Sequence, residues 1–156
     1  MWPSDWPAVP RAIATATDAA VRAARAADAA AVRAALDDLA ELPAEQVGVV
    51  LAAMVREQLE IAHPDGLDGD DVRAVLEPAV RGAAWLPELE AAAFVAALTG
   101  ALGVSGSDEA PPPPRALQAA GVVLTARLCA ATGVPATDSL RRALAEIARA
   151  ETVEMP

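Results

Sequence analysis

The sequence predicts an all-α protein of six or seven helices in antiparallel hairpins, assembled as a helical bundle or as a short, irregular α-solenoid-like repeat. Alanine, the residue with the highest helix propensity, supplies 42 of the 156 residues. Apolar residues recur three and four positions apart, as in amphipathic helices, and no stretch shows the period-two alternation of a strand. Because alanine adds little volume, we expect thin cores and closely spaced helices.

A chain of this length is expected to form one domain, residues 1–156. We divide it into an irregular arm at 1–8, a helical core at 9–103, a Pro-rich connection at 104–114 and a C-terminal helical hairpin at 115–151.

The predicted arm carries two tryptophans next to prolines. Pro3 and Pro7 disfavour helical geometry in the preceding residues, Trp2 and Trp6. These rings either cover an edge of the helical core or form an exposed aromatic anchor for a protein partner, since tryptophan is enriched at interface hot spots.

The core is expected to begin with helices over about 9–26 and 29–41. Asp28 favours a break between them, because aspartate is a good N-cap. One long helix is the alternative, since the junction contains neither glycine nor proline.

The clearest amphipathic pattern lies over 44–62, and we expect this helix to be central. A Leu-Pro pair at 42–43 precedes it, where the missing N–H of proline costs nothing. The proline after His63 should end it. The same pair at 86–87 is expected to open an equivalent helix that ends near 103.

Acidic residues cluster after this helix: Asp65, Asp68, Asp70 and Asp71, with His63 beside them. The calcium-loop pattern fails, because no glutamate stands at the twelfth position from Asp65. One histidine and one cysteine cannot make a zinc site alone. We therefore expect no metal here, but a turn in which Asp68 or Asp70 caps the next helix.

The helix after this turn is expected to begin near Val72 and to be kinked or restarted at Pro78. Arg73, Glu77 and Arg81 lie four residues apart, so we expect a ladder of exposed ion pairs.

The last two helices are expected over about 115–132 and 138–151. Four consecutive prolines before them favour a stiff polyproline II spacer. Thr137 or Asp138 should cap the last helix, and residues 151–156 should fray.

Short phrases recur along the chain and suggest a helical-hairpin repeat. An aliphatic-Arg-x-x-Leu pattern begins at Val32, Val72 and Leu140, and Gly-Val-Val-Leu occurs at 48–51 and 121–124. Their offsets share no period, so they indicate either repeat ancestry or chance similarity in an alanine-rich chain.

The charge pattern argues against two classes of partner. The net charge is −10, and the 12 basic residues, all arginine, are nowhere concentrated. Nucleic acids and anionic membranes would be repelled, so we expect neither. The longest nearly apolar run, 91–104, is too short to cross a bilayer.

We expect a cytoplasmic protein from a GC-rich bacterial genome. Arginine replaces lysine throughout, alanine is abundant, and the N-terminal segment lacks the features of a signal peptide. Cys129 is the only cysteine, which suits a reducing compartment, and its apolar helix predicts a buried thiol.

No pattern predicts catalysis or a cofactor, and His63 has no evident nucleophile near it. We expect a non-catalytic accessory module that binds a protein partner, because helical hairpins present grooved surfaces. Its candidate interaction residues are Trp2, Trp6, Arg56, Glu57 and Glu60.

Two alternatives remain. One is a small-molecule-binding bundle with a cavity lined by Met54, Trp85, Phe94 and Leu98. The other is an acidic inhibitor or immunity-type protein directed against a basic partner. A contiguous apolar cavity would favour the first, and carboxylates crowded on one face would favour the second. His63 against two carboxylates would favour an enzyme.

Small residues form strips on two predicted helices, and such strips allow close helix approach. They could serve internal packing or a homodimer seam. The strips comprise Ala92, Ala93, Ala96, Ala97 and Gly100 on one helix, and Ala116, Ala120 and Gly121 on the other.

Overall fold

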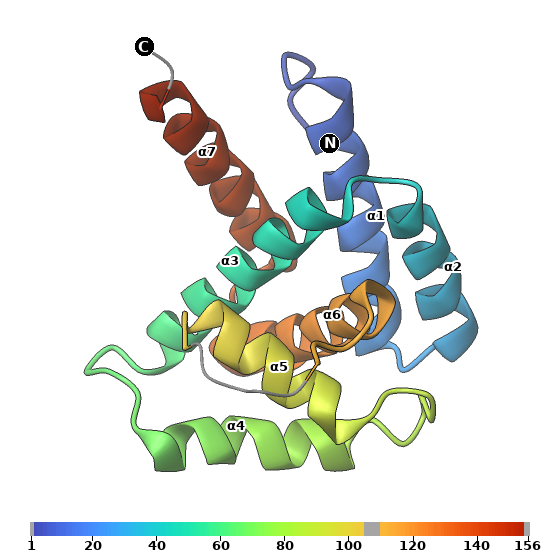
Figure 1. Ribbon diagram of the computed structural model, residues 1–156, viewed down its shortest axis with the longest axis vertical. Helices are drawn as coiled ribbons and strands as arrows, with labels where there is room; N and C mark the ends of the chain where they lie inside the picture. Colours follow the sequence, from blue (N-terminus) through green and yellow to red (C-terminus); the bar gives the residue numbers. More distant parts are fainter. Residues whose placement is uncertain (1, 105–109, 155–156) are drawn as a thin grey trace.

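The chain is all-helical, as predicted. A computed structural model describes residues 2–104 and 110–154, and in that part of the chain it contains seven α-helices and no strand (Figure 1). The helices are α1 (Ala8–Arg25), α2 (Ala29–Ala40), α3 (Ala44–Ala62), α4 (Gly69–Arg81), α5 (Ala91–Ala101), α6 (Pro114–Thr132) and α7 (Ala136–Glu154). Of the predicted connection at 104–114, residues 105–109 lie outside the described part of the chain, and residues 110–113 precede α6, which begins at Pro114.

The break between α1 and α2 is confirmed. Ala27 adopts a left-handed conformation with φ of 53°, which a continuous helix would not allow. The Asp28 side chain then accepts a hydrogen bond of 3.0 Å from the backbone N–H of Ala31. The predicted cap therefore begins α2.

The acidic turn also forms a cap, and α4 begins at Gly69 instead of Val72. Asp68 and Asp71 each accept a hydrogen bond from the other's backbone N–H, which completes a reciprocal capping box. Pro78 does not restart the helix. The carbonyl that Pro78 leaves unpaired belongs to Ala74, which is exposed to water, and this explains why the helix continues.

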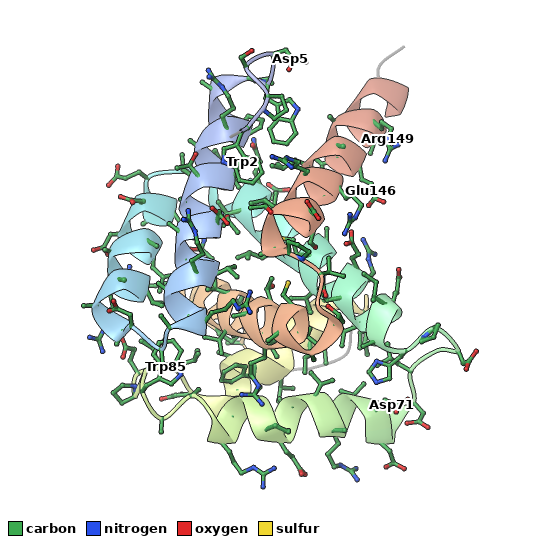
Figure 2. The ribbon with its side chains drawn as sticks, turned by 180° about the vertical axis from the view of Figure 1, so that it is seen from behind. Trp2, Asp5, Asp71, Trp85, Glu146 and Arg149 are labelled. Carbon is green, nitrogen blue, oxygen red and sulfur yellow. The ribbon has the colours of Figure 1, made fainter. Side chains whose placement is uncertain are left out.

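Other boundaries differ from the prediction. The Leu-Pro pair at 86–87 opens no helix: residues 82–90 form turns that contain Trp85, and α5 begins only at Ala91 (Figure 2). Glu88 in these turns accepts hydrogen bonds of 2.7 and 2.9 Å from Arg33 of α2, which link this segment to α2.

The C-terminal helix is longer than predicted at both ends. It begins at Ala136, so neither Thr137 nor Asp138 occupies the N-cap. It continues to Glu154, so residues 151–154 are helical where fraying was expected. The last two residues lie outside the described part of the chain.

In α4, Arg73 lies 3.6 Å from Asp70, one turn before it, instead of pairing along the predicted ladder.

Helix α6, not α3, is the central element. It contacts each of the other six helices, and it lies in the middle of the fold (Figure 1). Its nine consecutive residues from Gln118 to Ala126 are all buried. A helix that is buried all round is surrounded by protein, whereas an amphipathic helix faces water on one side. The clear amphipathic pattern of 44–62 therefore marked a peripheral helix.

This arrangement is a bundle, because in a solenoid each repeat would contact only its neighbours. Sequential helices do pack together in the pairs α1–α2 and α4–α5. In contrast, α3 packs chiefly on α6 and α7, and the chain turns by 117° between α6 and α7. No single helix of the described residues is long and apolar enough to cross a membrane. By length and composition alone, the bent α6–α7 pair passes the same test.

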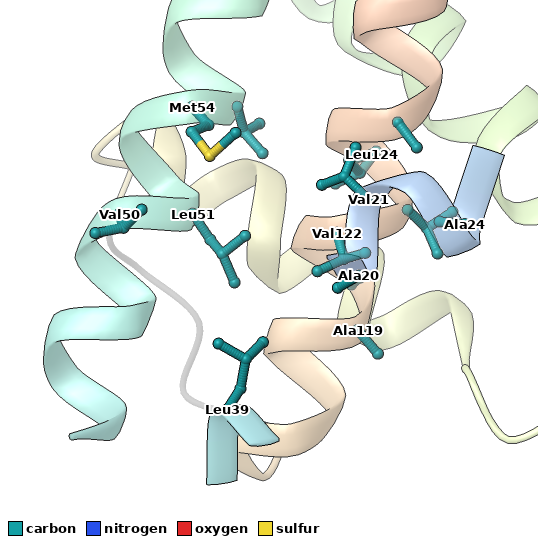
Figure 3. Close-up of a cluster of buried hydrophobic side chains, with 14 of the residues drawn as sticks. Ala20, Val21, Ala24, Leu39, Val50, Leu51, Met54, Ala119, Val122 and Leu124 are labelled. Atoms are coloured by element: carbon teal, nitrogen blue, oxygen red, sulfur yellow. The ribbon is translucent and has the colours of Figure 1, made fainter. Parts of the chain in front are cut away.

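The core combines many alanines with larger aliphatic residues. Figure 3 shows Ala20, Val21 and Ala24 of α1 beside α6, and Leu51 extends from α3 toward α6. A Cβ atom placed on Gly121 would lie 3.4 Å from the Cβ atom of Leu51, so α3 and α6 are in close contact at this point.

Candidate functional site

An apolar groove of about 400 Å³ lies between α3, α5 and α6 and opens to the surface. Helix α3 contributes Ala44, Glu45, Gly48, Leu51, Ala52 and Val55; α5 contributes Ala96, Ala97, Gly100 and Ala101; and α6 contributes Pro114, Leu117, Gln118 and Gly121.

The groove exists because its walls carry small side chains. Gly48 and Gly100 face each other's helices without a Cβ atom, and a Cβ placed on either would meet no other group within 4 Å. Larger residues at these positions would fill the space. The absence of side chains at these two positions leaves the groove open to the surface.

Two polar side chains line the groove. Gln118 is more than nine-tenths buried, and no hydrogen bond joins its amide to any residue that the structure describes. Glu45 is exposed and, among the described residues, is the only charged one in the lining. The groove therefore offers an apolar wall, one buried amide and one carboxylate.

The residues predicted to line a cavity lie elsewhere. Met54, Phe94 and Leu98 are fully buried in the core, and Trp85 is partly buried against it; none of the four lines the groove. These large side chains fill space, whereas the groove forms where side chains are absent. The strips of small residues predicted for internal packing or a dimer seam are the part of the sequence that indicated the groove, since Ala96, Ala97, Gly100 and Gly121 line the groove.

The polar residues proposed for protein interaction are divided between solvent and an internal contact. Arg56 and Glu60 are exposed on α3. Glu57 accepts hydrogen bonds of 2.6 and 3.0 Å from Arg142, which join α3 to α7 and raise the pKa of the arginine. The carboxylate of Glu57 is thus engaged within the chain.

The arm places Trp2 and Trp6 together. Their ring centroids lie 6.1 Å apart with the planes nearly parallel, and the guanidinium of Arg141 lies 5.6 Å from the centroid of the Trp2 ring. Both rings are partly buried against the core, and Figure 2 shows Trp2 between α1 and α7. The stack therefore attaches the arm to α7 while leaving part of each ring exposed.

The surroundings of His63 match a helix end. Its Nδ1 atom lies 3.1 Å from the carbonyl oxygen of Leu59, and its Nε2 atom lies 3.9 Å from one carboxylate, that of Asp71. Asp71 is itself part of the cap of α4. Within the described residues, no group of three His, Cys, Asp or Glu side chains is placed to hold a metal ion.

Cys129 is buried on α6, and burial raises the pKa of its thiol.

A second hollow of about 400 Å³ lies beside α1 and has charged residues, Arg11 and Asp38, in its lining. Its lining is more polar than that of the groove, and no buried amide faces it.

Comparison of the chain with models of known families, with characterised proteins and with solved structures found no match.

Proposed function

We propose that the protein is a binding protein that holds a small apolar ligand in the groove between α3, α5 and α6. Sites for small molecules are concave, mostly apolar, roughly 300–1,000 Å³ in volume, and contain a few polar groups that orient the ligand. The groove has this size and this lining. The observation that carries the proposal is the unfilled space at Gly48 and Gly100, next to the buried amide of Gln118.

A protein partner is the second candidate, because the groove is open along one side. Apolar side chains of a partner's amphipathic helix could enter it, as in helix-in-groove recognition. The inhibitor hypothesis gains less support. Asp37 pairs with Arg115 and Glu88 pairs with Arg33 on one surface, where Arg115 also donates to the carbonyl oxygen of Arg33, so these two carboxylates are already engaged by the chain's own arginines.

The test uses N-phenyl-1-naphthylamine, an uncharged apolar dye whose fluorescence rises in apolar sites. We expect the wild-type chain to bind it in the micromolar range. Gly48→Leu and Gly100→Leu each place a side chain in the open space of the groove and should weaken binding at least tenfold. Both substitutions raise helix propensity, so the variants should fold.

The matched control is Val95→Leu, which enlarges an exposed side chain of α5 outside the groove lining. It should leave dye binding unchanged. Circular dichroism would check that all three variants remain helical. If the wild-type chain binds no dye, or if both groove variants bind it as tightly as the control does, the proposal is wrong.

A further inference from the structure

We propose that the ligand of this groove is an amphiphile whose head forms hydrogen bonds and carries no negative charge, with an amine preferred over an alcohol. This inference rests on the proposed function and adds the chemical class of the ligand. It follows from Gln118 and Glu45, the two polar residues among the described lining.

Gln118 requires a polar group on the ligand. Its amide has donors and an acceptor, and none of them is paired with a described residue; the residue as a whole is only 6% exposed, while the amide atoms themselves still reach solvent. A buried polar group without a partner is costly, and a pure hydrocarbon in the groove would take away the water that still reaches the amide. An alcohol or amine head would supply the missing partner.

Glu45 determines the preferred charge of that head. Among the described lining residues it is the only charged one, and no described residue forms an ion pair with it. Arg115 follows the lining residue Pro114 on α6, but its guanidinium is engaged elsewhere. It lies 2.8 Å from a carboxylate oxygen of Asp37 and donates to the carbonyl oxygen of Arg33. No described cation therefore offsets Glu45 at the groove.

The net charge of the chain, −10, acts in the same direction. A carboxylate head would be repelled both by Glu45 and by the general field, whereas an ammonium head would be attracted. Because Glu45 is exposed, salt screens its contribution, and we expect it to change affinity by roughly two- to fivefold.

The experiment compares three probes with the same ten-carbon chain: decylammonium, decan-1-ol and decanoate, each below its micellar concentration. Each displaces N-phenyl-1-naphthylamine from the full chain at pH 7 and moderate ionic strength. We expect the ammonium to bind most tightly, the alcohol next and the carboxylate least tightly.

Two substitutions assign the preference to the two residues. Glu45→Gln should reduce the preference for the ammonium over the alcohol to the part that the general field supplies, while Glu41→Gln, which removes a carboxylate outside the lining, should leave their affinity ratio unchanged. Gln118→Leu should weaken decan-1-ol about two- to tenfold, the loss expected for one buried hydrogen bond.

The outcomes separate this inference from the proposed function. If decanoate binds as tightly as decylammonium, or if Glu45→Gln leaves the ammonium-to-alcohol ratio unchanged, the charge preference is wrong and the groove remains a binding site. If decan-1-ol binds equally well to wild type and Gln118→Leu, the role of the amide is wrong. If Gly48→Leu affects none of the three probes, the proposed function itself fails.

Discussion

The tetrapeptide Gly-Val-Val-Leu occurs twice in this protein, at 48–51 in α3 and at 121–124 in α6, and the two copies have different environments. In α6 all four residues are buried. In α3 only Val50 and Leu51 are buried, while Val49 is 48% exposed and Gly48 faces the groove. The same four residues therefore form a core segment in one helix and a surface segment in the other.

This difference shows that a short pattern predicts the helix but not its depth. Gly121 is covered because α3 crosses α6 at Leu51, and the rest of α6 is surrounded by five further helices. Gly48 is uncovered because no large side chain of α5 reaches it. Burial is thus decided by helices distant in sequence, and the following substitutions test that statement.

The largest contrast is expected between equivalent valines. Val122→Ala removes fully buried methyl groups and should lower the free energy of unfolding by roughly 2 kcal/mol. Val49→Ala removes an exposed side chain and should change it by less than about 0.5 kcal/mol. Urea unfolding followed by circular dichroism measures both values. Equal losses would contradict the assignment of α6 as the central helix.

A smaller contrast, of opposite sign, is expected between the glycines. Gly48→Ala should raise the free energy of unfolding by about 0.5–1 kcal/mol, because alanine favours the helix and its Cβ enters open space. Gly121→Ala gains the same propensity but places its Cβ 3.4 Å from Leu51, so its gain should be smaller or absent. Thermal unfolding of the two variants, compared with wild type, gives the difference. A larger increase in stability for Gly121→Ala than for Gly48→Ala would show that α3 and α6 are less closely packed at Leu51 than the 3.4 Å contact indicates.

The smallest effect is expected at the exposed link between α2 and the turns before α5. Hydrogen bonds from Arg33 lower the pKa of Glu88 from 4.5 to about 2. A carboxyl group whose pKa is lowered on folding contributes stability above its ordinary pKa and loses that contribution as the pH falls toward 2. Because both groups are exposed, the contribution should be small and should decrease with salt.

The comparison of wild type with Glu88→Gln isolates this link from the other carboxylates. Their urea midpoints should differ at pH 6, and the difference should narrow as the pH is lowered from about 4.5 toward 2. A difference that stays constant over this range would mean that the Arg33–Glu88 ion pair does not contribute to stability.

Much of the helical structure could be predicted from local sequence. Asp28 caps α2, and α3 ends at His63, because capping and proline sterics act within one turn. The start of α5 could not be predicted, because local sequence gives no sign that the Leu-Pro pair at 86–87 lies in turns with Leu86 buried in the core. Of the four residues proposed to line a cavity, Met54, Phe94 and Leu98 are instead fully buried in the core.

The groove was harder to predict, since it depends on which small residues meet no neighbour. The alanines and glycines at Ala96, Ala97, Gly100 and Gly121 were recognised as a surface for close packing. Gly121 does pack closely on Leu51, but Gly100 does not pack on anything. Local sequence does not distinguish these two glycines, because the difference in their surroundings arises only when α3, α5 and α6 pack together.

The central position of α6 has a consequence for synthesis of the chain on the ribosome. Helices α1 to α5 are made before α6, and each of them packs on it. Until residues 114–132 have left the exit tunnel, the apolar faces of the first five helices lack the surface that buries them. Completion of the core is therefore a late event in translation, and nascent chains that stop before α6 should be sensitive to protease and should attract chaperones that recognise exposed apolar segments.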